Sequence, residues 1–330
     1  MSQKRYPPVT LSAARFLLGL GRHPPVPVST GLLAGLPCDT YHPPSHNSHR
    51  RGTVLTVHGA SPLGPRDPRW VQLCRGLAHA GFTALAPLYP AVARLRLDPH
   101  QPAEVARTIH AATGDAGPPG LLSVSFSGGI ALLAAAQAPT RGILTIGAYG
   151  DARRTLRALL AAPGADPYGV LITLGSFGRP SPRLRDALLA VAEDDFHKHP
   201  ARPERYSGWL SSSEVHIYRS LVQSAHARQQ RLAPLLDAAD PLWDALHAES
   251  AIPRLRAPLT LVHGCDDRVI PASESVALAA ACRLQGHPAQ LVLTPLVSHG
   301  DAQQNVFQLA RNAPVLVNAV RNWMKSACIS

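Results

Sequence analysis

The chain has 330 residues, of which 45% are apolar and 16% are charged. This balance is typical of a folded globular protein and excludes a wholly disordered, collagen-like or coiled-coil chain. A chain of this length buries a sizeable core without disulfide or metal staples, as one large domain or two smaller ones.

The predicted elements begin with an N-terminal helical extension over residues 1–30, in which residues 11–20 form the helix. Residues 31–41 predict an antiparallel hairpin. From residue 53 onward, short apolar runs alternate with helical segments, and the runs are residues 53–57, 82–86, 121–125, 143–146, 259–262 and 290–293. This alternation predicts an α/β fold with a doubly wound, mostly parallel sheet.

The alternation stops between residues 151 and 257, where helical periodicity continues without a strand. Helices are expected over residues 151–160, 182–192, 212–232 and 241–248. Asp67-Pro68 and Asp240-Pro241 each place an N-cap acid before a proline in a first helical turn. We therefore expect one core of residues 31–150 and 258–330, with residues 151–257 inserted as a helical cap.

A serine lies where a predicted strand runs into a helix. In Leu121-Leu-Ser-Val-Ser-Phe-Ser-Gly-Gly-Ile130, Ser127 is flanked two residues away by the small residues Ser125 and Gly129. A nucleophile on such a sharp turn needs small neighbours, and the helix N-terminus favours negative charge developing beside it. The pattern is also compatible with a tight turn that carries no chemistry, so Ser127 needs partners.

Two further polar residues follow later strands. Asp267 lies three residues beyond Gly264 in the loop after the strand at residues 259–262, and His299 follows the last predicted strand. The carboxyl ends of parallel strands share one edge of a sheet, so Ser127, Asp267 and His299 are expected to converge there. An imidazole activates a serine hydroxyl, and a carboxylate orients the imidazole. Asp151 is an alternative acid, and Asp266 and Asp301 are weaker candidates.

The turn Val57-His58-Gly59-Ala60 closes the first long strand. Such a turn places a backbone N–H near the carbonyl oxygen of a bound substrate. The amides of Ala60 and Gly128 are predicted to form a two-donor oxyanion hole.

Together these segments resemble the α/β-hydrolase family from about residue 31 to the C-terminus. The resemblance rests on the His58-Gly59 turn, the elbow at residues 125–129, the acid loop at residues 264–271 and the loop at residues 298–300. Ser125 departs from the glycine that the family usually has at that position. The resemblance implies the family's fold and identifies the insertion with its cap or lid.

The sequence therefore predicts a serine hydrolase of carboxylic esters, in which Ser127 attacks, His299 acts as base and then acid, and Asp267 orients His299. An amidase, peptidase or acyltransferase with the same triad stays open, as does an inactive binding protein with the same fold. No cofactor and no metal is expected, because no HExxH motif or Cys/His cluster with ligand spacing occurs.

The partner predicted from this hypothesis is a small-molecule ester substrate. Association into a homodimer stays open as an alternative to a monomer. The formal net charge of +11 invites a nucleic-acid partner. We expect none, because the arginines are scattered and no nucleic-acid-binding motif accompanies them. The abundant Ala, Leu, Pro and Arg are typical of a GC-rich bacterial genome.

Five cysteines without a CxxC spacing fit a reducing compartment, so a cytoplasmic location is expected. No integral membrane span is expected, because no apolar stretch reaches about 18 residues. Peripheral membrane contact through the N-terminal segment stays open as an alternative to packing on the main body.

Overall fold

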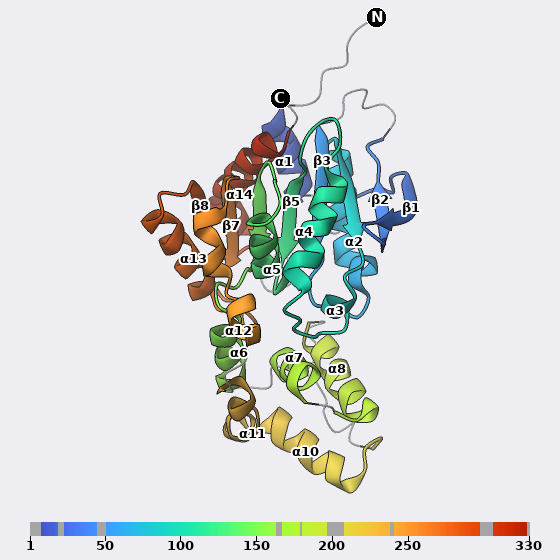
Figure 1. The fold of residues 1–330 in the computed structure, drawn as a ribbon, viewed down its shortest axis with the longest axis vertical. Helices are drawn as coiled ribbons and strands as arrows, with labels where there is room; N and C mark the ends of the chain where they lie inside the picture. The colour runs from blue at the N-terminus through green and yellow to red at the C-terminus, as the bar shows by residue number, and fades with distance from the viewer. Residues whose placement is uncertain are drawn as a thin grey trace, which may run out of the picture.

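The structure, a computed structural model, describes residues 8–18, 23–44, 51–162, 167–178, 180–196, 208–237, 241–297 and 306–328. An eight-stranded sheet forms its centre, with the strands in the order β1-β2-β4-β3-β5-β6-β7-β8 (Figure 1). Strands β3 to β8 run parallel to one another, while β2 is antiparallel to both β1 and β4. The doubly wound, mostly parallel sheet expected from the sequence is confirmed.

All six expected apolar runs are strands of this sheet. They are β3 (Gly52–Val57), β4 (Phe82–Pro87), β5 (Gly120–Val124), β6 (Ile143–Ile146), β7 (Leu259–Gly264) and β8 (Ala289–Thr294). The expected hairpin is present as β1 (Val28–Leu33) and β2 (Leu36–Tyr41), and it begins three residues earlier than predicted. Ala34 and Gly35 join its strands with φ angles of 50° and 84°, which matches the left-handed conformations of a tight hairpin turn.

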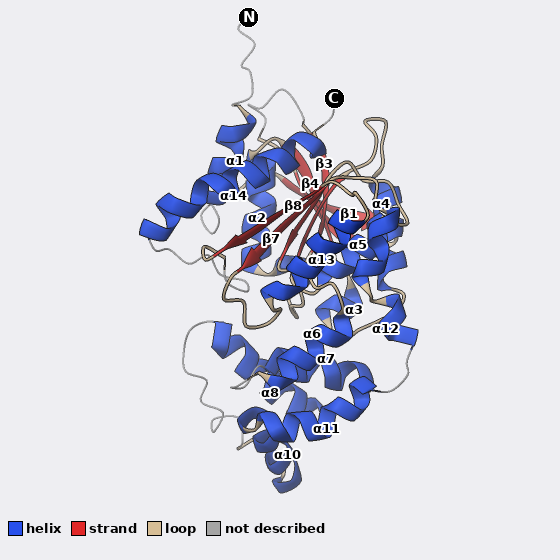
Figure 2. Cartoon of the chain, turned by 90° about the vertical axis from the view of Figure 1, so that its left-hand side faces the viewer, coloured by secondary structure: helices blue, strands red, loops and turns tan. Residues whose placement is uncertain are grey.

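Helices cover both faces of the sheet (Figure 2). One face carries α1 (Val9–Leu18), α2 (Pro68–His79) and α14 (Val306–Ala327), and the other carries α4 (Gln101–Ala112), α5 (Ser127–Ala135) and α13 (Ala272–Leu284). Successive β5 residues serve the two cores, since Leu121 packs in one and Leu122 in the other. Phe16 of α1 is buried in the same cluster as Trp323 of α14, so the N-terminal helix packs on the main body.

Every described element between β6 and β7 is helical. These elements are α6 (Ala152–Ala161), α7 (Pro167–Phe177), α8 (Pro182–Phe196), α10 (Ser212–Gln223), α11 (Ala225–Asp237), α12 (Pro241–Ala245) and the 3-10 helix η2 (Ala248–Arg254). Helices α6 to α11 lie beyond the end of the sheet opposite the chain termini (Figure 1). The segment expected as one helix over residues 212–232 is broken at Ser224, whose backbone is extended.

A buried arginine explains how the insertion tolerates that break. The guanidinium of Arg228 donates to the carbonyls of Leu221 and Val222 at the end of α10, and to those of Leu160 and Ala162 at the end of α6. Helix ends leave carbonyls without intrahelical donors, and a cation there also complements the helix dipole. Arg228 therefore joins two helix ends inside the insertion.

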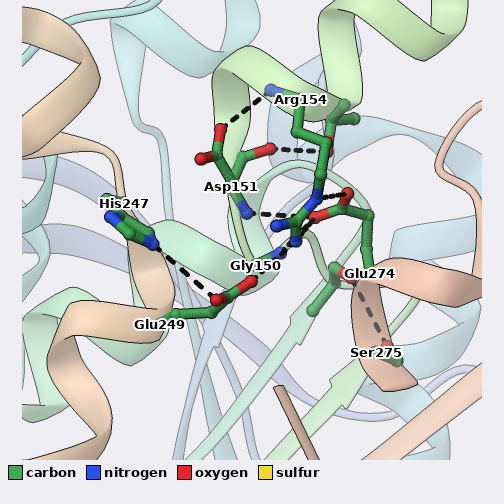
Figure 3. A network of polar contacts seen from close by, with 9 residues as sticks. Gly150, Asp151, Arg154, His247, Glu249, Glu274 and Ser275 are labelled. Atoms are coloured by element: carbon green, nitrogen blue, oxygen red, sulfur yellow. Dashed lines mark hydrogen bonds and ion pairs between the residues drawn. The ribbon is translucent and has the colours of Figure 1, made fainter. Parts of the chain in front are cut away.

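A buried glutamate of the core holds the start of the insertion, and Arg154 links it to the returning connection (Figure 3). Glu274, at the start of α13 and 2% exposed, accepts hydrogen bonds from the backbone N–H groups of Gly150 and Asp151 and from the guanidinium of Arg154. Arg154 also contacts Glu249 on the returning connection, at 2.6 Å. The first residues of the insertion are thus held to the core beside β7.

Two remaining elements complete the part of the chain near the sheet edge. They are the short helix α3 (Pro90–Ala93), which follows β4, and the 3-10 turn η1 (Gly64–Arg66), which precedes α2. None of the helices in the described ranges has both the length and the apolar character needed to cross a bilayer.

Candidate active site

The sharp turn after β5 is at Ser125. This residue directly follows the last strand residue, Val124, and its φ angle is 58°. A non-glycine residue with this left-handed backbone costs on the order of 1–2 kcal/mol, and such residues cluster at functional sites. The neighbouring strands hold the conformation, because Ser125 N–H donates to the Ile146 carbonyl of β6 at 2.7 Å. Ser125 is partly exposed.

Ser127 lies two residues further on and is the first residue of α5. Its side chain is fully buried, and its Oγ donates to the carbonyl of His58 at 2.5 Å. The turn that we expected at Ser127 therefore lies two residues earlier, and Ser127 instead joins α5 to the end of β3.

The two glycines after Ser127 are required by packing. A Cβ on Gly128 would come within 2.5 Å of the Ala148 Cβ, and a Cβ on Gly129 within 2.3 Å of the Tyr149 ring. These distances are far below ordinary contact, so α5 approaches the loop after β6 too closely for any side chain. Gly129, which was expected to be a small neighbour of a nucleophile at Ser127, is small for this reason.

The turn after β3 passes directly beside Ser125. A Cβ on Gly59 would lie 3.1 Å from Val124 Cγ2, which is a tight contact, and 3.5 Å from the Ser125 Cβ, which is an ordinary one, so this turn lies against the end of β5. Ala60 follows and is partly exposed. The other expected oxyanion donor, Gly128, is engaged elsewhere, because its N–H donates to the Ser125 carbonyl at 2.8 Å. The amide after the turn residue is that of Phe126, which occupies the N-cap position of α5.

His58 fixes this turn as a neutral imidazole. Its Nε2 accepts from the Tyr89 N–H at 3.1 Å, so Nδ1 carries the proton and donates to the Gly59 carbonyl at 2.9 Å. Burial lowers the His58 pKa to about 4, against the opposing effects of the Gly59 hydrogen bond and the Asp67 charge. The ring therefore connects the β3 and β4 ends without carrying a charge at neutral pH.

Asp67 stabilises the other end of the loop that follows β3. Its carboxylate accepts from Ser61 Oγ at 3.0 Å and from the Arg69 N–H and guanidinium. Burial acts to raise the Asp67 pKa, but the hydrogen bonds and charge of Arg69 outweigh it and the pKa is lowered. Asp67 also caps α2, as expected from the Asp-Pro pair.

Asp267 lies in the loop after β7, at the same edge of the sheet as Ser125. Its side chain is 3% exposed, and Oδ1 accepts from the N–H groups of Val269 and Ile270, each at 2.9 Å. The Nε2 of the buried His263 lies 3.5 Å from Oδ2 of Asp267 and 2.8 Å from the Ile270 carbonyl. The loop thus holds a buried carboxylate in a fixed orientation.

The alternative acid has a different role. Asp151 caps α6, with Oδ1 accepting from the Arg154 N–H at 2.8 Å. Asp266 belongs to the Asp267 loop and is exposed. His299 and Asp301 lie outside the described residues, so the structure gives no geometry for the expected base.

A hollow lined by Phe126 and Ser127, the two residues that follow Ser125, opens at the boundary between the core and the insertion. It encloses about 240 Å³, including open solvent, and its wall is mostly apolar. The lining residues are Ala60, Val92, Leu95, Arg96, Leu97, Gln101, Phe126, Ser127, Ile130 and Ile172. Because Ala60 and Phe126 flank the turn and also line the hollow, a group bound at Ser125 would extend into this space.

Known structures were compared with this geometry. A puromycin-hydrolysing peptidase of Mycobacterium tuberculosis superposes with a TM-score of 0.52 at 14% identity, over 92% of this chain and 39% of that chain. A meta-cleavage product hydrolase of Pseudomonas fluorescens gives 0.48 at 15% identity, over 89% and 97%, respectively. An acylaminoacyl peptidase of Pyrococcus horikoshii also gives 0.48, at 12% identity over 91% and 39%.

The first of these matches, together with the strand order and the strained turn after β5, decides the architecture. This chain has the α/β-hydrolase fold. No protein-family model and no curated protein matches the sequence. The chain spans about two fifths of the length of the two peptidases. Backbone geometry confirms the α/β-hydrolase fold expected from the sequence motifs. The sequence identities to these structures, between 12% and 15%, show a shared fold and not a shared activity.

Three polar residues near the carboxyl edge of the sheet were not predicted from the sequence to have a role. They are Gln101, which lines the hollow, His263, which supports the acid loop, and Glu274, which anchors the insertion. His263 ends a predicted strand and Glu274 follows Pro271 in a first helical turn, so position alone could have marked both. Nothing in the sequence marked Gln101 as a lining residue, because its side chain is positioned by a hydrogen bond to Arg96 in the loop between α3 and α4.

Among the residues that the structure describes, no group of three or more histidine, cysteine, aspartate or glutamate side chains is arranged to hold a metal ion.

Proposed function

We propose that the protein is a serine hydrolase of carboxylic esters, with Ser125 as the nucleophile in place of Ser127. The observation that carries this proposal is the left-handed backbone of Ser125 between β5 and α5. This turn lifts a serine above the sheet edge, whereas the hydroxyl of Ser127 is buried and donates to His58.

The proposed oxyanion hole uses the amides of Ala60 and Phe126. Phe126 replaces Gly128 in this role, because the Gly128 N–H already donates to Ser125. The Ala60 amide follows Gly59, where the turn lies against the end of β5. Two such donors stabilise the negative charge that develops on the carbonyl oxygen, and the loss of one costs about 3 kcal/mol of barrier in enzymes where this has been tested.

In the proposed reaction, Ser125 Oγ attacks the ester carbonyl carbon while His299 takes its proton. The tetrahedral intermediate collapses, and His299 returns the proton to the departing alcohol. Water then attacks the acyl-enzyme with the same proton transfers, which releases the acid and restores Ser125. Asp267 is proposed to orient His299, since its buried carboxylate is held at the same sheet edge. No cofactor takes part.

The helical insertion is proposed to act as a cap over this site. Support comes from Ile172 of α7, which lines the hollow, and from hydrogen bonds that join α7 to the loop before α4. An amide substrate is the second candidate, because the triad chemistry serves both bonds and one neighbour is a peptidase.

The test combines hydrolysis of short p-nitrophenyl esters and anilides with labelling by a fluorophosphonate probe. We expect ester hydrolysis and a label on Ser125, both lost in Ser125→Ala. Faster turnover of the anilides than of the esters would favour the amidase. A wild-type protein that neither turns over esters or anilides nor takes the label would instead be a binding protein with this fold.

A further inference from the structure

We propose that Gln101 selects substrates whose short acyl group carries a hydrogen-bond donor, such as a hydroxyl. This inference rests on the proposed function and adds a specificity-determining residue to it. Gln101 is the first residue of α4, and its side chain is 2% exposed where it lines the same hollow as Phe126 and Ser127.

The orientation of the Gln101 amide is set by its neighbour. Nε2 donates to the Arg96 carbonyl at 3.2 Å. The reversed amide would place Oε1 against that carbonyl, where two acceptors repel, so Oε1 is the atom left for other contacts. Among the described residues, no donor reaches Oε1 although it is buried.

A buried carbonyl oxygen without a donor is unfavourable by about 1–3 kcal/mol. Buried polar side chains in native proteins nearly always have a partner, so we interpret this exception, in a residue of the hollow wall, as the position of a bound group. The rest of the wall is mostly apolar, with residues such as Val92, Ile130 and Ile172. The wall also includes Arg96 and Ser127, but the Gln101 Oε1 is the acceptor among these side chains that lacks a donor in the part of the chain described.

The backbone beside Gln101 indicates that the wall has a defined shape. Leu95, which is 3% exposed and lines the hollow, has a φ angle of 55°. Left-handed leucine is strained, and such strain persists only where surrounding contacts impose it. Those contacts come from α7, since Ser176 Oγ accepts from the Leu97 N–H at 2.8 Å and the Gly175 carbonyl accepts from the Arg96 guanidinium at 3.1 Å.

The size of the hollow limits the acyl group. The hollow is small, since even its volume of about 240 Å³ includes space open to solvent. A short branched acyl chain suits this space better than a fatty acyl chain. Its donor would reach Oε1 of Gln101 while its carbonyl lies between Ala60 and Phe126.

The experiment compares two p-nitrophenyl esters that differ only in a hydroxyl and a methyl group, 3-hydroxybutyrate and 3-methylbutyrate. We expect wild-type protein to hydrolyse the hydroxyl ester with the higher kcat/KM. In Gln101→Met, which keeps the length of the side chain but lacks the acceptor, the ratio of the two kcat/KM values should fall roughly tenfold.

Ile172→Val provides the matched control, because it changes an apolar part of the same wall and should alter both esters alike. If wild type prefers the methyl ester, or if Gln101→Met leaves the ratio unchanged, Gln101 does not select a donor and a buried water occupies its place. If Gln101→Met does not fold, the comparison of the two esters with wild-type protein still tests the proposal, because a preference for the methyl ester overturns it.

Failure of the proposed function is recognised separately. If no ester is hydrolysed and Ser125 takes no fluorophosphonate label, calorimetric binding of 3-hydroxybutyramide and 3-methylbutyramide replaces turnover. Tighter binding of the hydroxyl compound by wild type, lost in Gln101→Met, would support the role of Gln101 without catalysis. Equal binding of the two amides would overturn it.

Discussion

Substitution of Ser125 separates catalysis from stability at one position. Removing the hydroxyl in Ser125→Ala should lower ester kcat/KM by at least about a thousandfold, because the nucleophile is lost while the oxyanion donors remain. The left-handed strain stays, since alanine has the same Cβ as serine. In Ser125→Gly the hydroxyl is also lost, but the strain at φ 58° is relieved.

The magnitude of that relief follows from the backbone. A Cβ in the left-handed region costs on the order of 1–2 kcal/mol, part of which is offset by the greater freedom of glycine in the unfolded chain. Ser125→Gly should therefore be more stable than Ser125→Ala by about 1 kcal/mol. Both inactive proteins would then differ only in the urea concentration at which they unfold.

Ser127→Ala serves as the comparison at the neighbouring serine. It removes the 2.5 Å hydrogen bond to the buried His58 carbonyl, so it should reduce stability by about 1–2 kcal/mol. Its kcat/KM should fall less than tenfold.

The assays are p-nitrophenyl ester hydrolysis, mass-spectrometric location of the fluorophosphonate label, and urea unfolding. The assignment of Ser125 as the nucleophile is refuted if Ser127→Ala abolishes hydrolysis while Ser125→Ala retains it. It also fails in part if Ser125→Gly is no more stable than Ser125→Ala, since the strain would then be absent.

Two further predictions concern electrostatics. Because burial lowers the His58 pKa from 6.5 to about 4, the unfolded chain binds a proton that the native ring excludes, and stability should fall by up to about 3 kcal/mol as pH drops from 6.5 to 4. Urea unfolding across this range should give a shallower decline for His58→Gln, and an equal decline would contradict the assignment. Glu274→Gln should destabilise the protein by about 1–2 kcal/mol, less than for a fully buried pair because Arg154 is half-exposed. Arg157→Gln, which breaks a surface pair with Asp237, should change thermal unfolding little, and an effect as large as that of Glu274→Gln would argue against the anchor.

The centre of the sheet could be predicted because β3, β5 and β7 are buried on both faces and therefore read as short apolar runs bounded by Gly or Pro. The helix starts at Pro68 and Pro241 were predicted from the Asp-Pro pairs. The break at Ser224 was not predictable from periodicity, because the apolar spacing continues through it. It depends on Arg228, whose contacts come from the end of α6 as well as from α10.

The position of the turn after β5 was predicted two residues too late. Small residues alternate at Ser123, Ser125 and Ser127, so the spacing of small residues around a central serine fits both Ser125 and Ser127. Packing separates them, because the pair at residues 128–129 is glycine to clear Ala148 and Tyr149. No local pattern shows that contact, since its partners come from the loop after β6.

The place where the insertion leaves the sheet is also the place where it returns. Asp151 pairs with His247 across a single bridge, and the Glu249 N–H donates to the Gly150 carbonyl at 3.1 Å. The two ends of this long segment are therefore as close as the ends of a hairpin, a geometry that tolerates replacement of everything between them. A short glycine-rich linker from Gly150 to Ala248 would preserve the path from β6 to β7, so inserted segments could be exchanged on this scaffold without rebuilding the sheet.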